Sequence, residues 1–377
     1  MDAHHLLLWR ILRNKELSEI YAMMSLRTMA MSLISIFIPV YLYTIGYDIP
    51  SILLFFIIVS STQALLCPLS AKISSKIGFK HGMLFGFVFY SFYYIMLATV
   101  GGERHLIYMA AAVYGVAQAL FWIPFHTFFS TLTDGKKRGE EVALLDMFPS
   151  IISIIAPFVG GLIVFFFGFG TLFVVGLAFL ISAVVPLLAS KDMKMPFKFS
   201  FKVDGFDKKV AASLVAYNSQ INDTVWPIFI FTVVGSAATL GGIVAFSVLI
   251  GFLTIWIVGK MCDRGYRKKL LDIGSVTQCV LWVFRSLATS FAHVISLESV
   301  WRVVSKFVDV PYNSAYYEKA NKTTKRLEFS VLREMVIHGS IVIVFAFICL
   351  FYSFIPNMAA LFIIAAIGPL FGMLIER

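Results

Sequence analysis

Apolar runs of about 20 residues recur from residue 20 onward, and no long polar segment separates them. An α-helix needs about that length to cross the hydrocarbon core of a bilayer. Only 14% of the residues are charged, whereas soluble proteins carry about 25%. We therefore predict an all-α polytopic membrane protein with no room for a soluble domain.

Hydrophobic length and loop residues divide the chain into twelve predicted transmembrane helices. The first six lie near residues 18–44, 49–71, 81–100, 105–132, 142–168 and 170–189. The other six lie near residues 210–234, 238–260, 268–288, 291–318, 327–354 and 356–375. We expect a cytoplasmic lead-in at 1–17, a six-helix half at 18–189, a cytoplasmic linker at 190–209 and a second half at 210–377.

The loop cations predict the orientation of these helices. They concentrate on the side that would hold both termini, in the loops at 72–80, 135–141, 190–209, 260–269 and 319–326. The opposite side has a single loop cation, Arg104. Because cytoplasmic loops carry an excess of Lys and Arg, we expect both termini to be cytoplasmic in a cell membrane. This topology explains the net charge of +10 without nucleic acid.

The two halves align with each other at a nearly constant offset. Pro39 and Lys76 correspond to Pro227 and Arg264, 188 residues later, and Pro124, Glu141, Leu145 and Ser153 correspond to Pro311, Glu328, Leu332 and Ser340, 187 residues later. Duplicated halves are common among transporters. We therefore predict two parallel copies of a six-helix unit.

A basic loop occupies the same position in each half. Residues 259–268 follow the pattern G-x-x-x-D-R-x-G-R-R through Gly259, Asp263, Arg264 and Arg267, with Tyr266 replacing the second glycine. The first copy, at 71–80, keeps Lys76 and Gly78, but Ser75 replaces the acid. With the repeat, these loops resemble the major facilitator superfamily, which implies two parallel six-helix halves and a gating role for the loops. For the first copy, membrane topology alone is the favoured explanation.

The resemblance also implies partners for these loops. We expect the loop at 259–268 to face Glu141 and Asp146, and the loop at 72–80 to face Glu328 and Glu334. Residues 156–161, Ala-Pro-Phe-Val-Gly-Gly, are similar to a G-P-x-x-G-G pattern of exchanger members, which slightly favours export. A kink that serves only helix packing explains them equally well.

Ionisable side chains inside a membrane are costly, so they mark polar interior surfaces. One face of the tenth helix carries Glu298, Arg302, Lys306, Asp309 and Asn313 within an arc of about 80°. We predict that Arg302, Lys306 and Asn313 bind solute, and that Glu298 and Asp309 take part in proton coupling. Pairing of Glu298 with Arg302, and of Asp309 with Arg302 or Lys306, would explain the same face without a ligand.

The corresponding face of the fourth helix is aromatic and neutral. It carries Tyr114, Gln118, Trp122 and His126, which could stack against an organic solute and hydrogen-bond to it. Helix packing with a satisfied histidine explains this face equally well.

A polar cluster in the seventh helix lies just before a helix-breaking proline. It contains Asn218, Asn222, Asp223 and Trp226, followed by Pro227. Polar side chains beside freed backbone groups are a common way to build an intramembrane site. We predict that Asp223 is the first choice for proton coupling, with a structural salt bridge as the alternative.

Two arginines complete the set of intramembrane charges. Arg27 in the first helix is predicted to hold an anionic group or to pair with Asp223, unless it snorkels. Arg285 is predicted to snorkel at the outer surface.

These patterns favour a proton-coupled secondary transporter that moves a small organic solute by alternating access. Because the two halves are fused in one chain, we expect a monomer to be functional. An uncoupled facilitator and a non-transporting receptor or scaffold remain alternatives. No enzyme activity, metal or cofactor is expected, because the chain has no Walker, HExxH, GxSxG or CxxC pattern.

Overall fold

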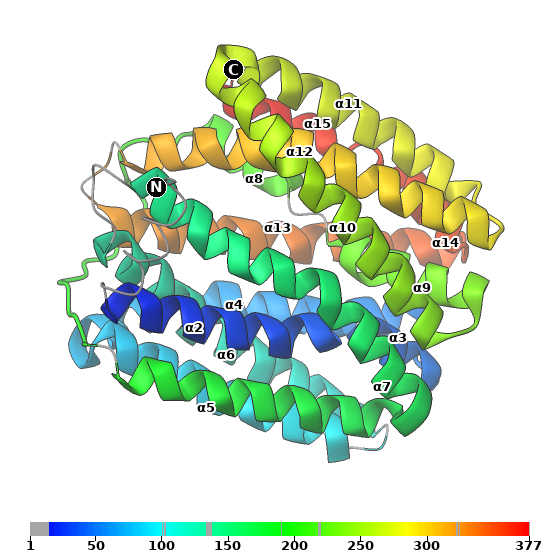
Figure 1. The fold of residues 1–377 in the computed structure, drawn as a ribbon, viewed down its shortest axis with the longest axis horizontal. Helices are drawn as coiled ribbons and strands as arrows, with labels where there is room; N and C mark the ends of the chain where they lie inside the picture. The colour runs from blue at the N-terminus through cyan, green and yellow to red at the C-terminus, as the bar shows by residue number, and fades with distance from the viewer. Residues whose placement is uncertain are drawn as a thin grey trace, which may run out of the picture.

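The computed structural model describes residues 15–99, 101, 103–132, 138–189, 191–217, 220–321, 323 and 325–376. Within this part of the chain every regular element is a helix, and no strand forms (Figure 1). The predicted all-α fold is confirmed.

The first half of the chain forms long helices at the predicted positions. They are α2 (Lys15–Ile34), α3 (Phe37–Thr44), α4 (Ile49–Ile77), α5 (Phe79–Thr99), α6 (Arg104–Leu132) and α7 (Arg138–Ala189). The 52-residue helix α7 contains two predicted spans, because Gly168 has φ 80° and breaks the helical geometry. A positive φ is readily adopted only by glycine, so the chain can turn there.

The second half is divided into more pieces. They are α8 (Lys208–Tyr217), α9 (Ile221–Val234), α10 (Ala237–Met261), the π-helical turn η1 (Cys262–Tyr266), α11 (Arg267–Ser286), α12 (Phe291–Asn321), α13 (Arg326–Phe354), α14 (Met358–Ala365), α15 (Pro369–Gly372) and the 3₁₀ turn η2 (Met373–Glu376). Gly265, at φ 86°, makes the turn between α10 and α11. Gly235 ends α9 in the left-handed conformation, and the Ser236 hydroxyl caps the start of α10.

Eight segments of the described chain are long and apolar enough to cross a membrane. Two of them, Pro149–Ala189 (41 residues) and Ala237–Ser286 (50 residues), contain the glycine breaks described above and are long enough for two passes each. Helix α12 is not among the eight, because the charged residues Glu298, Arg302, Lys306 and Asp309 in its middle make it too polar to count as an apolar span. With α12 and the α8–α9 pair, the arrangement is consistent with twelve spans.

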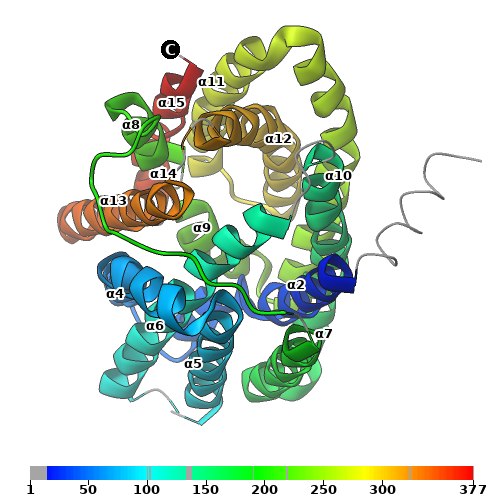
Figure 2. The same ribbon diagram turned by 90° about the vertical axis from the view of Figure 1, so that its left-hand side faces the viewer.

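The helices are arranged as a bundle whose two ends are formed by the connecting segments. Residues 191–207 run across the left-hand end in Figure 1, which faces the viewer in Figure 2. Helix α2 packs on α7, and α6 lies between α4 and α5. In the second half, α12 packs against α10 and α11. The two halves meet through α7 against α10 and through α4 against α13.

Glycines allow α7 and α10 to approach closely. A Cβ added at Gly161 would lie 2.6 Å from the Ala237 carbonyl oxygen, and one added at Gly241 would overlap the Pro157 carbonyl oxygen. Pro157 and Gly161 therefore give the 156–161 pattern a packing role at the contact between the two halves.

Candidate functional site

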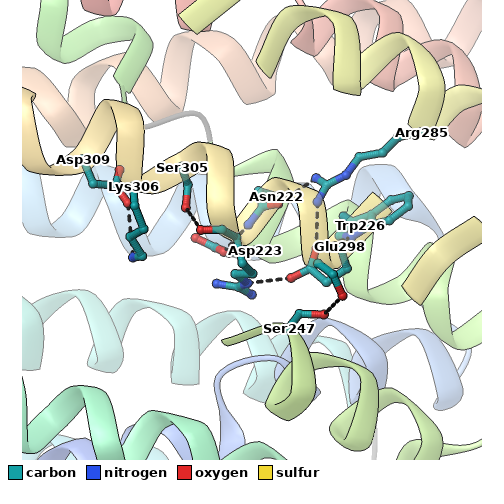
Figure 3. A network of polar contacts seen from close by, with 11 residues as sticks. Asn222, Asp223, Trp226, Ser247, Arg285, Glu298, Ser305, Lys306 and Asp309 are labelled. Carbon is teal, nitrogen blue, oxygen red and sulfur yellow. Dashed lines mark hydrogen bonds and ion pairs between the residues drawn. The ribbon is translucent and has the colours of Figure 1, made fainter. Parts of the chain in front are cut away.

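The charged face of α12 is organised around the carboxylate of Glu298 (Figure 3). Its Oε2 accepts hydrogen bonds from Arg285 Nη2 at 2.7 Å and from Trp226 Nε1 at 2.8 Å. Its Oε1 accepts from Arg302 Nε at 2.7 Å. Glu298 is 1% exposed. The carboxylate is therefore held by three donors, two of which are cations, and charge-assisted bonds of this kind are the stronger ones.

The prediction that Arg285 snorkels at the outer surface is wrong. Arg285 is 0% exposed, and its Nη1 donates to Asn222 Oδ1 at 2.7 Å. The guanidinium carbon lies 4.2 Å from the ring centroid of Trp226, 4.3 Å from that of Trp301 and 4.8 Å from that of Trp282. Aromatic faces attract a cation, and Glu298 supplies the opposite charge, so Arg285 is stable in the protein interior.

Asp223 lies next to this network but is held differently. It is in the first turn of α9, where the helix dipole favours a negative charge. Its Oδ1 accepts a hydrogen bond from Asn222 Nδ2 at 3.0 Å, and its side chain is exposed. Arg302 acts on it electrostatically. The structure therefore brings Asp223 and Trp226 of α9 beside Glu298 and Arg302 of α12, a contact between two helices that the sequence patterns did not predict.

The rest of the α12 face is more accessible. Lys306 Nζ lies 3.5 Å from Asp309 Oδ2, and both side chains are partly exposed. Asn313 is also partly buried. Asn218, predicted to line the cavity, lies outside the described residues.

A second polar cluster lies in the first half, along α6. Gln118 Oε1 accepts hydrogen bonds from Tyr90 and from Trp122 Nε1, the latter at 2.9 Å, and Gln118 Nε2 donates to Tyr114 Oη at 3.1 Å. Trp122 stacks on His126 with ring centroids 5.3 Å apart. Tyr114, Gln118, Trp122 and His126 are all partly exposed. These four side chains therefore form one continuous surface on α6, joined by hydrogen bonds and ring stacking, which we call the α6 stripe.

Arg27 joins the α6 cluster and does not pair with Asp223, which corrects that alternative. Its Nη2 donates to Tyr90 Oη at 2.8 Å. Its guanidinium carbon lies 4.1 Å from the ring centroid of Phe121 and 4.5 Å from that of Trp122. Sequence reasoning missed Tyr90, a tyrosine in the Tyr-rich helix α5.

Comparison with known proteins identifies the fold. A family model described as Major Facilitator Superfamily matches residues 9–200, just over half of the chain. The chain belongs to the major facilitator superfamily. It is therefore a membrane transporter by family and not an enzyme. No curated protein matches it in sequence.

Two solved structures show how fully the superfamily fold is retained. The nucleoside transporter NupG superposes with a TM-score of 0.69 at 14% identity, covering 96% of this chain and 97% of that chain. A point mutant of NupG gives a TM-score of 0.70 at 12% identity, covering 95% of this chain and 98% of that chain. At such low identity the likeness shows the shared fold alone.

The second superfamily loop, at 259–268, forms the turn between α10 and α11. It contains Gly259, Asp263 and Arg264 in or beside η1, and Arg267 pairs with Glu376 near the end of the chain. Asp146 lies in α7, but its side chain is outside the described part of the structure, so the predicted contact with this loop stays a prediction.

The first superfamily loop contacts the linker that follows α7. The Asp192 carboxylate accepts a hydrogen bond from the Lys80 backbone N–H at 2.9 Å and forms a close contact with His81 Nδ1. Gly78 has φ 110°, which favours glycine, and a Cβ added there would overlap the Asp192 carboxyl group and displace it. Lys76 lies in the last turn of α4.

Within the described residues Glu334 pairs with side chains of α4 and α13 and not with the first loop, contrary to prediction. It is buried, and it accepts a hydrogen bond from Gln63 Nε2 of α4 at 3.2 Å. Its other partners are Arg333 and His338, both in α13. Glu334 therefore links α13 to α4, which belong to different halves of the transporter.

Within the described residues, no group of three or more His, Cys, Asp or Glu side chains could hold a metal ion.

Proposed function

We propose that this transporter moves a small organic solute by alternating access and couples the movement to protons. The proposal rests mainly on Asp223, an exposed carboxylate beside the buried Arg285–Glu298 pair. An ionisable group inside a membrane protein that has solvent access and a charged neighbour is suited to a proton relay.

The two neighbouring carboxylates differ in what holds them. Glu298 receives three hydrogen bonds, and protonating it would leave two guanidinium groups without their anion. We therefore expect Glu298 to stay ionised. Among the described residues, Asp223 accepts one hydrogen bond, from the neutral Asn222 amide, and its side chain is exposed, so it is the carboxylate that we expect to exchange protons with water.

Arg302 connects proton exchange to solute binding. It donates to Glu298, acts electrostatically on Asp223, and keeps 26% of its side chain exposed. Protonation of Asp223 removes one anionic neighbour of Arg302, which leaves this cation more available to a polar solute. The two binding events are then coupled, and by linkage each changes the affinity for the other.

The α6 stripe supports an organic solute with a flat, polar ring. Tyr114 and Trp122, which stack on Tyr93 and His126, contribute partly exposed ring surface, and the Gln118 amide supplies hydrogen-bonding groups. Nucleosides are the first probes to test, because the two structures compared above are described as nucleoside transporters.

Alternating access would consist of rocking between the halves at 18–189 and 210–377, joined by the cytoplasmic linker at 190–209. Both termini would be cytoplasmic in a cell membrane, and one chain would suffice. The contacts of α7 with α10 and of α4 with α13 support this division, because they are where the halves meet. Export is the proposed direction, and it rests only on the resemblance of residues 156–161 to the exchanger pattern, residues that also pack α7 against α10.

The first experiment identifies a solute. Purified full-length protein is screened by thermal shift against nucleosides, nucleobases and heteroaromatic amides, because a ligand that binds the folded state raises the melting temperature. Any hit is then measured in liposomes of known protein orientation with an imposed pH gradient. We expect accumulation that collapses when a protonophore removes the gradient.

The Asp223→Asn variant tests the coupling carboxylate. It should lose gradient-driven accumulation and retain solute exchange across the membrane. Glu103→Gln, at an exposed loop carboxylate, is the matched control and should retain both. Accumulation that is unaffected by the protonophore would identify an uncoupled facilitator, and binding without any transport would identify a receptor. Either result would overturn the proposal.

A further inference from the structure

The two buried arginines of this transporter have similar aromatic surroundings but different electrostatic ones. Arg285 has Trp226, Trp282 and Trp301 around it and pairs with Glu298. Arg27 is 5% exposed and has its guanidinium against aromatic rings. Among the described side chains, however, no carboxylate pairs with Arg27. Within the described part of the chain, Arg285 therefore has a carboxylate partner and Arg27 has none.

The hydrogen bonds of Arg27 are also incomplete. Its Nη2 donates to Tyr90, a neutral hydroxyl, and its buried Nε has no hydrogen-bond partner in the described part of the chain. The carboxylate of Glu19, in the same helix, is eight residues away, which is about 12 Å along the axis. A buried cation without an anion destabilises a folded protein, and ring faces offset only part of that cost.

Arg27 lies next to a partly exposed surface from which an anion could approach it. Trp122 lies against its guanidinium and also belongs to the partly exposed α6 stripe with Tyr114, Gln118 and His126. The Gln118 amide carries a second N–H beyond the one it donates to Tyr114. A solute that lies on this stripe can therefore reach Arg27 with one end while its ring contacts the aromatic side chains.

We propose that the site between α2, α5 and α6 binds an organic oxyanion, a carboxylate or a phosphate attached to a planar ring. Arg27 binds the oxyanion, for which a guanidinium offers a pair of parallel N–H donors. The side chains of Tyr114 and Trp122 contact the ring. This inference rests on the proposed transport function and narrows its solute from polar rings in general to anionic ones.

The experiment compares pairs of probes that differ in charge. Benzoate is compared with benzamide, and uridine monophosphate with uridine, by thermal shift and by tryptophan fluorescence of the full-length protein. We expect the anionic member of at least one pair to bind about tenfold more tightly than the neutral member. The benzoate and monophosphate results distinguish a carboxylate from a phosphate.

Two substitutions at Arg27 separate binding from structure. Arg27→Gln should abolish the preference for the anion, whereas Arg326→Gln, at an exposed cation, should leave it unchanged. Arg27→Met replaces a buried charge that has no carboxylate partner among the described side chains with an apolar side chain of similar length. It should raise the melting temperature of the ligand-free protein and also lose the anion preference. A structural ion pair would give the opposite change in stability.

Several results would overturn this inference. They are equal binding of both members in each pair, no binding of any of the four probes, an anion preference that survives in Arg27→Gln, and a lower melting temperature for ligand-free Arg27→Met. Transport with an unchanged charge preference in Arg27→Gln would refute the anion site and leave the transport proposal intact. Anion binding that depends on Arg27, without any transport in liposomes, would support the anion site and refute the transport proposal.

Discussion

Replacing Glu298 with glutamine is expected to destabilise the transporter by about 3–5 kcal/mol, the usual cost of removing one partner of a buried ion pair. The cost for a buried pair applies here, because Arg285 is 0% exposed and Glu298 is 1% exposed. Water cannot solvate the guanidinium once its anion is gone. The three tryptophan faces around Arg285 remain, but they do not supply a full negative charge.

The hydrogen bonds of Glu298 explain why glutamine is a poor replacement despite its similar shape. All three partners of the carboxylate are donors: Arg285, Arg302 and Trp226. A glutamine side chain has one acceptor oxygen and one NH₂ group that itself donates. In either orientation the NH₂ group faces at least one donor, so one hydrogen bond becomes a repulsive contact.

The loss of stability can be measured by unfolding in mixed micelles of SDS and a mild detergent, with tryptophan fluorescence as the signal. Asp309→Asn is the comparison, because Lys306 and Asp309 form a partly exposed pair worth about 0–1 kcal/mol. The double variant Arg285→Met/Glu298→Gln should recover much of the loss. If Glu298→Gln costs no more than Asp309→Asn, the buried Arg285 does not depend on the Glu298 carboxylate for its stability.

Two further predictions concern the contacts that position the helices. Gly241→Ala should destabilise the protein by about 1–3 kcal/mol and slow transport, because the new methyl group overlaps the Pro157 carbonyl oxygen. Gly242→Ala is the control, since its Cβ would lie 3.9 Å from the nearest atom, and equal effects in a micelle unfolding assay would refute this reasoning. Asp192→Ala should increase amide hydrogen exchange at Lys80, whose N–H loses its acceptor. Asp204→Ala, at an exposed linker position, should not, and protection that persists in Asp192→Ala would contradict the linker contact.

Much of the candidate site could be predicted because it follows helical periodicity. Glu298, Arg302 and Asp309 fall on one face of α12, and Tyr114 and Trp122 fall on one face of α6, wherever those helices lie in the bundle. Pairing of Glu298 with Arg302, four residues apart on one helix, was likewise open to prediction. Contacts within one helix depend on sequence spacing alone.

The errors concern contacts between helices. Arg285 was predicted to lie at the outer surface because it is near the end of its helix, but its side chain points inward to Glu298 of α12 and Asn222 of α9. Arg27 could have paired with Asp223, but it lies against α5 and α6. Nearby tryptophans, Trp226, Trp282 and Trp301, were the available signal for Arg285, because aromatic faces can stabilise a buried cation.

By itself the sequence determined the all-α membrane architecture and the position of the helices, because a bilayer requires long apolar helices and glycine permits the turns at Gly168 and Gly265. The tertiary structure alone decided that Arg285 pairs with Glu298, and that Arg27 lies against Tyr90, Phe121 and Trp122 with no carboxylate partner among the described side chains. Hydropathy and periodicity describe one helix at a time, whereas the cost of a buried charge depends on which side chains neighbouring helices bring within a few ångströms.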